Sequence, residues 1–453
     1  MMDEMLKMMQ NRKILILGFG REGKSTYALL RKNFPAKVLF IADANENIAS
    51  AAEIKEDDFV HLKTGPGYLQ NLEEFDLIIK TPGISLKDID TRSLKITSQT
   101  DLFLQPFRDQ SIGITGTKGK STTTTLIHHI FQYAERKSVL LGNMGRPAFD
   151  HLEEIDTETN VVYEMSSHQL EHISTSPHVA VLLNYFQEHL DAYSSYRDYR
   201  LAKWNIAKFQ EPGDIFIVND DDPLIREHLQ VCRSAGLVFS FSMDHEVPRG
   251  CFIRDGKIVF RNENEEVLFD LKKKRKLEGE HNIRNIMAAI LVCRLKGIDP
   301  VLIAEAVAGF RGLEHRLEDC GIHGGIHFYN DSIATIPEAC IAAVKALGEV
   351  DTLILGGFDR GIDYADLALF LEKSNIRNLI FTGKAGRRIR DLMHTGGDRR
   401  IVMISQFDAF IDVVKEVTPP GKICLLSPAA ASYDEFPNFE IRGKRFKELI
   451  DSL

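Results

Sequence analysis

The sequence predicts an α/β protein with three domains, each built on a mostly parallel sheet with flanking helices. Short apolar segments typical of buried strands, such as residues 13–17, 38–42 and 215–219, alternate with longer segments of helical spacing. Several of the apolar segments lead directly into glycine-rich turns, as strands do at the ligand-binding edge of such sheets. At 453 residues the chain is long enough for two or three domains.

The composition is that of an ordinary globular protein and argues against several function classes. Hydrophobic residues make up 44% of the chain and charged residues 27%. The formal net charge of -9 argues against nucleic-acid binding, which usually needs a concentrated basic face. The six cysteines lack C-x-x-C spacing, so neither a zinc site nor a disulfide framework is suggested. No signal-peptide core or membrane-spanning run is present, and we expect a cytoplasmic protein without membrane insertion.

Residues 1–106 are predicted to form a Rossmann-like domain, whose first strand ends in a loop that fits two motifs. Residues 18–25 match both the strict phosphate-loop pattern G-x-x-x-x-G-K-S and the dinucleotide pattern G-x-G-x-x-G. Asp43 follows the second strand about 20 residues on, where a ribose-binding acid is expected. The strand at 75–79 runs into Lys80 and Thr81 and offers no acid for Mg²⁺. We therefore assign this loop to a nucleotide diphosphate without ATP chemistry.

Residues 107–312 are predicted to form a domain like the phosphate-loop ATPases. The strand near residues 111–115 is followed by Gly116, Gly119, Lys120 and Ser121 and then by a helix. Glycines let the backbone wrap around phosphate oxygens, the lysine reaches the β- and γ-phosphates, and the serine hydroxyl can bind Mg²⁺. The strict pattern fails here, because Ile114 stands where the first glycine should be. The surrounding sequence nevertheless favours this loop over residues 18–25 as the one that binds the phosphates of ATP.

The context is an acid at the end of a neighbouring strand. Residues 160–163 form an apolar strand that ends at Glu164, where a carboxylate beside a phosphate loop can hold Mg²⁺. A predicted helix at about 194–209 carries Lys203, which by itself would be interpreted as a solvated surface lysine. Residues 225–275 are expected to form a small, mostly β elaboration, and the helix that follows could face an adenine or a ribose.

Residues 313–453 are predicted to form a third, Rossmann-like domain. Apolar strands end near residues 331, 357, 383 and 428, each followed by a polar or glycine-rich turn. Pro337 is placed in the first turn of a helix, which is a favoured position for proline. The chain ends in an amphipathic helix.

Several short segments, taken together, resemble the Mur ligase family of ATP-dependent amide-forming enzymes, and in particular its members that add D-glutamate. The resemblance covers essentially the whole chain. The segments that carry it are 116–122, 164–171, 189–191, Lys203, 281–285, 315–316, 330–332, and 426–429 with Ser432. The phosphate loop of that family is shorter than the strict pattern, which explains the mismatch at Ile114.

The resemblance implies two nucleotide sites. The first would bind UDP-N-acetylmuramoyl-L-alanine through Gly20, Asp43, Thr81, Asn143 and His189. The second would bind ATP between the central and C-terminal domains. Its implied residues are Gly116, Thr117, Lys118, Gly119, Lys120, Ser121, Thr122, Asn285, Arg316 and Asp331.

The resemblance also implies the catalytic and metal-binding residues. Lys120, His189 and Lys203 would be catalytic, and two Mg²⁺ ions would be held by Ser121, Glu164, His189 and a carbamylated Lys203. Carbamylation would turn a cation into an oxygen ligand. D-Glutamate would be held by Thr335, Arg360, Ser432 and Phe439, with the arginine suited to a bidentate grip on a carboxylate. The protein is expected to act as a monomer.

Two departures and three rivals bear on this hypothesis. Ile333 and Arg360 stand where some relatives carry lysine, near where phosphate or the amino acid must sit, so alternative amino-acid acceptors stay open. A sibling ligase with a diamino acid or a folate-like acceptor is one rival, although the Asp-Asn-Pro-Arg signature of the diamino-acid ligases is absent. An NAD-dependent oxidoreductase built on the first glycine loop leaves Lys120, Glu164 and His189 unexplained. A non-catalytic UDP-sugar sensor would not need these residues or Lys203.

Overall fold

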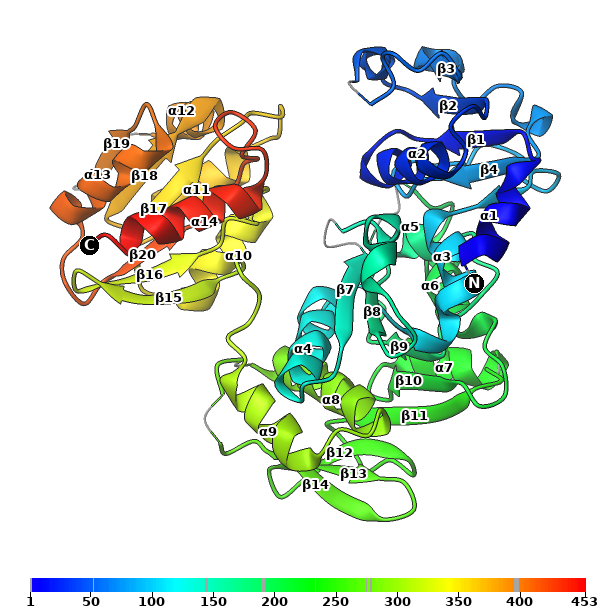
Figure 1. The fold of residues 1–453 in the computed structure, drawn as a ribbon. Helices are drawn as coiled ribbons and strands as arrows, with labels where there is room; N and C mark the ends of the chain where they lie inside the picture. The colour runs from blue at the N-terminus through cyan, green and yellow to red at the C-terminus, as the bar shows by residue number, and fades with distance from the viewer. Residues whose placement is uncertain are drawn as a thin grey trace. The chain divides into compact units, whose positions relative to one another are not determined.

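The protein forms two compact units, which we describe separately. The computed structural model describes residues 2–51, 53–142, 146–188, 192–232, 234–273, 275–277, 279–394 and 399–453. Unit 1 comprises Met1–Phe310 and unit 2 comprises Arg311–Leu453 (Figure 1). Unit 1 contains two sheets and unit 2 contains one, each flanked by helices, which confirms the predicted class of three α/β domains. The predicted boundaries after residues 106 and 312 stay predictions.

The first sheet of unit 1 is parallel throughout and has the order β3-β2-β1-β4-β5. The three predicted strands are present, each within two residues of its predicted bounds, and β3 was missed because its exposed face gives no clear alternation. Helix α2 begins at Arg21, directly after Gly20 of the glycine loop. The elements are α1 Met2–Gln10, β1 Ile14–Leu17, α2 Arg21–Asn33, β2 Leu39–Asp43, β3 Val60–Thr64, β4 Leu77–Lys80, β5 Ile96–Thr97 and α3 Gln99–Phe107.

The second sheet has nine strands in the order β14-β13-β12-β11-β10-β9-β6-β8-β7. Its strands pair in parallel from β12 to β7, and β12, β13 and β14 pair antiparallel. The β elaboration therefore extends one edge of the central sheet. The strands are β6 Ser111–Thr115, β7 Ser138–Gly142, β8 Asn160–Glu164, β9 Val179–Leu182, β10 Ile215–Asn219, β11 Leu237–Ser242, β12 Gly250–Arg254, β13 Lys257–Arg261 and β14 Glu265–Asp270.

The helices of the second sheet include one that is buried on all sides. Helix α8 has an unbroken run of buried residues from Asn285 to Cys293, which is typical of a helix within a core rather than on its surface. The helices are α4 Lys120–Tyr133, α5 Ser167–Leu170, α6 Tyr196–Lys208, α7 Pro223–Val231, α8 Glu280–Leu295 and α9 Pro300–Gly309, with a 3-10 helix, η5, at Ala148–Glu154.

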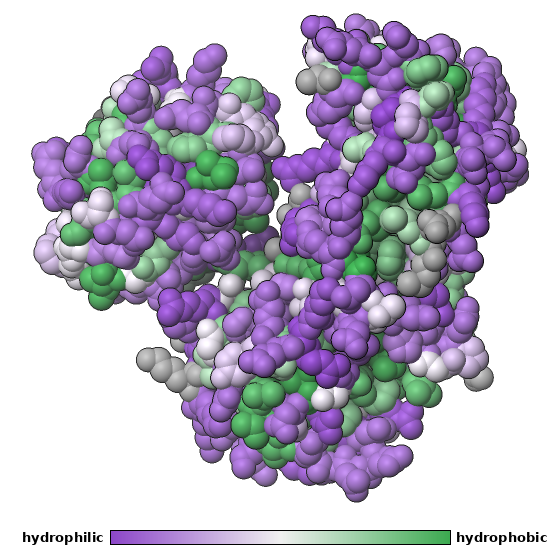
Figure 2. Space-filling view, viewed as in Figure 1, coloured by the Kyte–Doolittle hydropathy of each residue, from purple (hydrophilic) through white to green (hydrophobic). Residues whose placement is uncertain are grey.

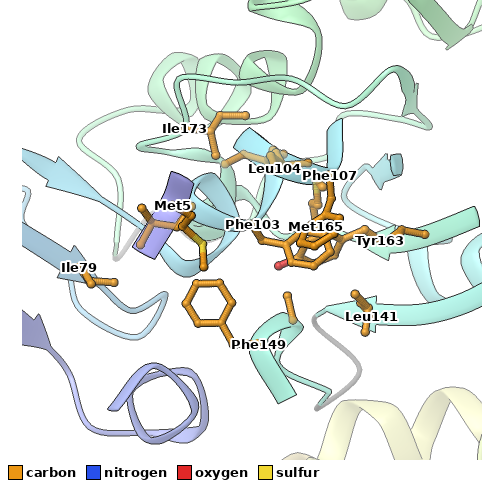
Figure 3. Packing of buried hydrophobic residues seen from close by; sticks show 14 of the residues in the cluster. Met5, Ile79, Phe103, Leu104, Phe107, Leu141, Phe149, Tyr163, Met165 and Ile173 are labelled. Carbon is orange, nitrogen blue, oxygen red and sulfur yellow. The ribbon is translucent and has the colours of Figure 1, made fainter. Parts of the chain in front are cut away.

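The two sheets of unit 1 share one apolar core. Phe103 on α3 packs edge-on against Tyr163 on β8, with ring centroids 5.6 Å apart and an angle of 88° between the planes. Met5, Phe149 and Met165 belong to the same buried cluster (Figure 3). Since burial of side chains of this size stabilises by roughly 1.5–3 kcal/mol each, the core holds the first sheet against the second. The glycine loops that follow β1 and β6 therefore belong to one unit.

Unit 2 is built on a six-stranded sheet in the order β15-β16-β20-β17-β18-β19. Only the edge strand β15 is antiparallel, and the carboxyl ends of the other strands meet at one edge of the sheet. The elements are β15 Glu318–His323, β16 Ile326–Asn330, α10 Pro337–Leu347, β17 Val350–Gly356, α11 Ala365–Lys373, β18 Asn378–Thr382, α12 Gly383–Leu392, β19 Arg400–Met403, α13 Phe410–Val417, β20 Ile423–Leu426 and α14 Phe439–Ile450.

The face drawn in Figure 2 is largely polar. On this face, hydrophilic side chains surround smaller apolar areas. Of the helices in the described residues, none combines the length and the apolar character that crossing a membrane requires.

Candidate active site

The loop after β6 has the backbone geometry of an anion-binding site. Gly116 and Gly119 have φ of +155° and +84°, and α4 begins directly after Gly119, which provides no side-chain cap for its amides. A Cβ on Gly119 would lie 2.2 Å from Asn285 Oδ1, and one on Gly116 would lie 2.8 Å from Leu183 Cβ. Only glycine fits either position, and the start of a 14-residue helix is a common place for proteins to bind phosphate oxygens.

Side chains from neighbouring elements hold the loop in shape. Asn184 Oδ1 accepts hydrogen bonds from the amides of Thr117 and Lys118, at 3.0 and 2.9 Å. The Thr117 hydroxyl lies 3.0 Å from the Tyr199 hydroxyl on α6. Sequence reasoning assigned no role to Asn184, although a polar residue just beyond a buried strand is a signal that could have found it. The loop is therefore preorganised by groups outside the phosphate-loop pattern.

Two lysines donate to a single carbonyl oxygen of this loop. Lys120 Nζ and Lys203 Nζ each lie 2.9 Å from the oxygen of Gly116, and Lys120 also donates to the oxygen of Thr117 at 2.9 Å. Lys203 is only 2% exposed, so its interpretation as a surface lysine is wrong. Burial, and secondarily the charge of Lys120, hold the pKa of Lys203 well below its ordinary value. A lowered pKa favours the neutral form of the amine, which is the nucleophilic form.

Glu164 lies on the strand next to the loop. It is the last residue of β8 and pairs in register with Ile114 on β6, and it is 1% exposed. A buried carboxylate and the Ser121 hydroxyl are oxygen donors of the kind that Mg²⁺ prefers, so these residues fit the ion. Among the described residues, no group of three or more His, Cys, Asp or Glu is arranged to hold a metal. His189 and Asn143 lie outside the described residues, and the full ligand set stays a prediction.

A cavity of about 470 Å³ opens beside the two lysines. The loop 82–85 after β4 forms one part of its lining, and Lys120 and Lys203 line it together with residues 166–168 and Glu171. The His168 ring stacks on Tyr193 with centroids 5.2 Å apart and an angle of 14° between the planes. Sequence reasoning noted residues 164–171 as a motif but gave no role to positions 166–168. Loop 82–85 of the first predicted domain and Lys120, at the end of the phosphate loop, thus line the same cavity. A site for two substrates needs such an arrangement.

The first glycine loop does not use its lysine and serine as a phosphate loop would. Lys24 Nζ pairs with Glu53 Oε1 at 2.7 Å, and Ser25 is 6% exposed and accepts a hydrogen bond from Gln99 Nε2 at 3.2 Å. Both side chains are therefore occupied away from any ligand at the loop. Context, rather than the better match to the strict pattern, indicates the phosphate loop.

Three residues predicted to bind the UDP moiety gather around this first loop. Asp43 accepts from the amides of Phe19 and Asn45, at 2.7 and 2.8 Å, and the Thr81 hydroxyl donates to the oxygen of Leu17 at 3.1 Å. A Cβ on Gly20 would meet nothing within 4 Å, so the backbone there borders open space. Gly20, Asp43 and Thr81 are thus close together, and their contacts with a nucleotide stay a prediction.

A buried carboxyl joins α2 to the segment that follows Glu164. Glu22 Oε1 accepts from Gln169 Nε2 at 2.6 Å, and Gln169 Oε1 accepts from the amide of Ser166 at 2.9 Å. Glu22 Oε2 is buried without a hydrogen-bond partner among the described residues. Burial raises the pKa of Glu22 to about 7, although the Gln169 bond and Lys80 act to lower it.

This carboxyl predicts a pH-dependent stability. From about pH 4.5 to 7 the folded state holds a proton on Glu22 that the unfolded state releases, so stability falls as the pH rises through this range. The free energy of unfolding of the wild-type protein is expected to fall by on the order of 1–3 kcal/mol between about pH 5 and pH 8. Glu22→Gln is expected to remove this fall. Urea unfolding at the two pH values measures it, with the exposed Glu73→Gln as control. An unchanged pH dependence in Glu22→Gln would contradict this assignment.

In unit 2, Asp331 lies at the carboxyl end of β16 in a polar network. It is 5% exposed and accepts from the Ser427 hydroxyl at 2.8 Å and from the amide of Leu317 at 3.1 Å. Burial raises its pKa to about 6, opposed by these bonds and by the charge of Arg316. Asp331 and Arg316 are thus electrostatically coupled, and their contact with ATP stays a prediction.

The residues predicted to hold the amino acid lie in loops of unit 2. Arg360 Nη2 donates to the oxygen of Thr335 at 2.8 Å, which brings these two together. Ser432 is buried in the loop after β20, and the Phe439 ring lies 6.4 Å from that of His315. Binding of an amino acid by these residues stays a prediction.

A glycine loop between a strand and a helix, with one half-buried and one buried lysine and a strand-end acid beside it, is the arrangement of a phosphate-loop protein. Residues 114–293 match the model of the Mur ligase middle domain. Relatives named UDP-N-acetylmuramoylalanine--D-glutamate ligase include one from Symbiobacterium thermophilum, 36% identical over 87% of this chain and 88% of its own length. Another, from Clostridium novyi, is 33% identical over 100% of this chain and 99% of its own length.

Solved structures share the fold at low identity. UDP-N-acetylmuramate-alanine ligase from Thermotoga maritima aligns with a TM-score of 0.54 and 19% identity, over 98% of this chain and 100% of that one. MurF from Acinetobacter baumannii aligns with a TM-score of 0.57 and 17% identity, over 78% of this chain and 80% of that one. The chain belongs to the Mur ligase family.

Proposed function

We propose that this protein joins D-glutamate to UDP-N-acetylmuramoyl-L-alanine, with ATP as the energy source, in cytoplasmic synthesis of peptidoglycan precursors. The names of relatives at 31–36% identity support the reaction. The structural observation that carries it is the pair Lys120 and Lys203 on one carbonyl of the phosphate loop, beside buried Glu164 and a cavity. The protein acts as a monomer in this proposal.

The reaction proceeds in two steps, because a carboxylate does not react with an amine at neutral pH. A carboxylate oxygen of the alanyl group attacks the γ-phosphorus of ATP, and ADP leaves. The amine of D-glutamate then attacks the carbonyl carbon of the acyl phosphate, and phosphate leaves from the tetrahedral intermediate. Lys120 and the first amides of α4 offset the negative charge that develops on the transferred phosphoryl group. His189 is proposed to accept the amine's proton.

The metal and the modified lysine complete the proposed site. Ser121, Glu164, His189 and Lys203 would hold two Mg²⁺ ions, which supply charge neutralisation on the phosphate oxygens when bound. The low pKa of Lys203 supports its part in this, because only a neutral amine adds carbon dioxide to form a carbamate. Burial of Lys203 at 2% exposure would protect such a carbamate from solvent.

Assignment of the remaining residues follows the same proposal. Gly20, Asp43, Thr81 and Asn143 bind the UDP-sugar, and Asn285, Arg316 and Asp331 bind ATP together with residues 116–122. Thr335, Arg360, Ser432 and Phe439 bind D-glutamate. The proximity of Arg360 to Thr335 supports a shared contact with a carboxylate.

The test is release of ADP and phosphate with UDP-N-acetylmuramoyl-L-alanine and a panel of amino acids, each supplied separately with Mg²⁺. We expect turnover with D-glutamate and little with L-glutamate, lysine or diaminopimelate. Preference for a diamino acid or for a folate-linked glutamate would show that the protein is a related ligase with a different acceptor. Ile333 and Arg360, which stand where some relatives carry lysine, are the residues that bear on this choice. Absence of ATP turnover with every acceptor would favour a UDP-sugar sensor. A change in NADH absorbance would favour an oxidoreductase.

A further inference from the structure

Unit 2 contains a buried arginine that neither the sequence motifs nor the proposed chemistry uses. Arg442 lies on α14 and is 2% exposed. Its guanidinium donates to the Ser332 hydroxyl at 3.0 Å and to the backbone oxygen of Ser332 at 2.9 Å. It also donates to the backbone oxygens of Ala430 and Ala431, at 3.1 and 3.3 Å. All four acceptors are neutral oxygen atoms.

Each of these hydrogen bonds ends beside a residue proposed to hold the amino acid. Ser332 lies three positions before Thr335, and Ala431 directly precedes Ser432. The Ser332 hydroxyl, which accepts from Arg442, donates in turn to the oxygen of Phe439 at 2.8 Å. One guanidinium thus links the segments that carry three of the four proposed residues.

The fourth residue, Arg360, is reached through the same backbone. The amide of Phe358 donates to the oxygen of Ala431 at 2.8 Å, so the turn after β17 is attached to the loop that Arg442 holds. A Cβ on Gly357, whose φ is +135°, would lie 2.3 Å from that same oxygen and 3.1 Å from Arg442 Nη1. The close approach requires glycine at position 357, and the two loops are in direct contact there.

The loop after β20 does not hold its shape by backbone preference alone. Ala429 has φ of +55°, in the left-handed region that residues other than glycine rarely adopt. Such a conformation persists only where surrounding contacts impose it, and the two carbonyls that follow are both bound by Arg442. The guanidinium therefore contributes to the geometry of the loop that carries Ser432.

The chemistry of these contacts requires arginine rather than lysine. Burial lowers the pKa of Arg442 to about 10, so the side chain is still charged at neutral pH. Its planar fork reaches acceptors on two separate segments at once, whereas an ammonium group is a compact donor on a flexible stem. Substitution by lysine would keep the charge and lose part of the bridge.

We propose that Arg442 is a positioning residue for the amino-acid site, which acts by joining the loops 330–335, 357–360 and 430–432 to the start of α14. The inference rests on the proposed function, since that function assigns the amino acid to these loops. Arg442 itself is too buried to contact a substrate in this arrangement. Its effect should therefore appear in the binding of the amino acid and not in the binding of either nucleotide.

The experiment compares Arg442→Lys with Arg445→Lys on the same helix. Arg445 is exposed and pairs with Asp408 and Glu448, which makes it a matched control. KM is measured for D-glutamate, ATP and UDP-N-acetylmuramoyl-L-alanine, together with kcat and the thermal midpoint. We expect Arg442→Lys to raise the KM for D-glutamate about tenfold or more, with the other two KM values within about twofold of wild type. Arg445→Lys should leave all three unchanged.

A second variant keeps the inference testable if Arg442→Lys fails to fold. Ser332→Ala removes one acceptor of Arg442 and the bond to Phe439 without changing any charge. It should raise the KM for D-glutamate by a smaller factor in the same direction. A folded Arg442→Lys with a wild-type KM for D-glutamate, or one that raises all three KM values equally, would overturn the inference. If Arg442→Lys does not fold, an unchanged KM for D-glutamate in Ser332→Ala would overturn it.

A failure of the proposed function would be seen in the wild-type enzyme, independently of the variants. If the wild-type enzyme uses an amino acid other than D-glutamate, that proposal fails. The comparison of KM values is then made with the amino acid that is used. A selective rise for it would support the positioning role of Arg442, and a wild-type value or a uniform rise would overturn it.

Discussion

Lys120→Ala is expected to reduce the release of ADP by about 10³-fold or more, because in the proposed function it removes the positive charge that Lys120 brings to the γ-phosphate. Lys120 Nζ already lies 2.9 Å from two carbonyl oxygens of the loop, so its position is set before the nucleotide binds. Single-turnover measurement with radiolabelled ATP would show whether the acyl phosphate still forms. The KM for UDP-N-acetylmuramoyl-L-alanine should change little.

The control for Lys120→Ala is the lysine of the other glycine loop. Lys24 fits the strict phosphate-loop pattern but pairs with Glu53, and its replacement by alanine should leave ADP release within about twofold of wild type. The two variants together test which loop serves ATP. A severe loss in Lys24→Ala with normal activity in Lys120→Ala would reverse the assignment of the two loops.

Lys203→Ala and Lys203→Arg are both expected to lower kcat by about 10²–10³-fold. Neither side chain can supply the neutral amine that adds carbon dioxide, although arginine keeps the positive charge. The wild-type protein should gain the mass of one carbon dioxide at Lys203, and its activity should fall when bicarbonate is removed. Intact-protein mass spectrometry under native conditions and assays in degassed buffer measure the two effects.

Lys208 provides the matched control for these variants. It lies on α6 with Lys203 but is exposed, with Nζ 5.0 Å from the centre of the Phe209 ring. Lys208→Ala should keep full activity and full dependence on bicarbonate. Normal activity in Lys203→Arg would show that Lys203 acts as a charge or not at all, and the carbamate would then have to be abandoned.

Much of the fold could be predicted because buried strands leave a strong local pattern. The runs that became β1, β6, β8 and β10 have apolar centres and are buried over nearly their whole length, as is typical of parallel strands covered on both faces. Strand β3 lies at an edge and is half exposed, so its sequence carries no such pattern and it was missed. The sequence carries no clear signal for the start of α2, because Gly20 provides no side-chain cap.

The site could be predicted only in part, for a similar reason. Gly116, Gly119, Lys120 and Glu164 lie on adjacent strands and loops whose order follows from a parallel sheet. No sequence pattern indicated a role for Asn184 or for the cavity-lining residues 166–168. Arg442 was missed entirely, since an arginine on an amphipathic C-terminal helix looks like any solvated residue until its surroundings are known. Predictions for Asn143 and His189 concern positions outside the described residues.

By itself, the sequence determined that this is an α/β protein with two glycine loops, of which the second is followed by a strand-end acid. It could not determine which groups contact Lys24 and Lys203, or how exposed each of these side chains is. The tertiary structure decided that Lys24 and Ser25 are occupied by Glu53 and Gln99, and that Lys203 is buried against the carbonyl of Gly116. The physical reason is that a side chain's partner and its exposure depend on residues far away in the chain. The sequence pattern around a lysine reports only its nearest neighbours.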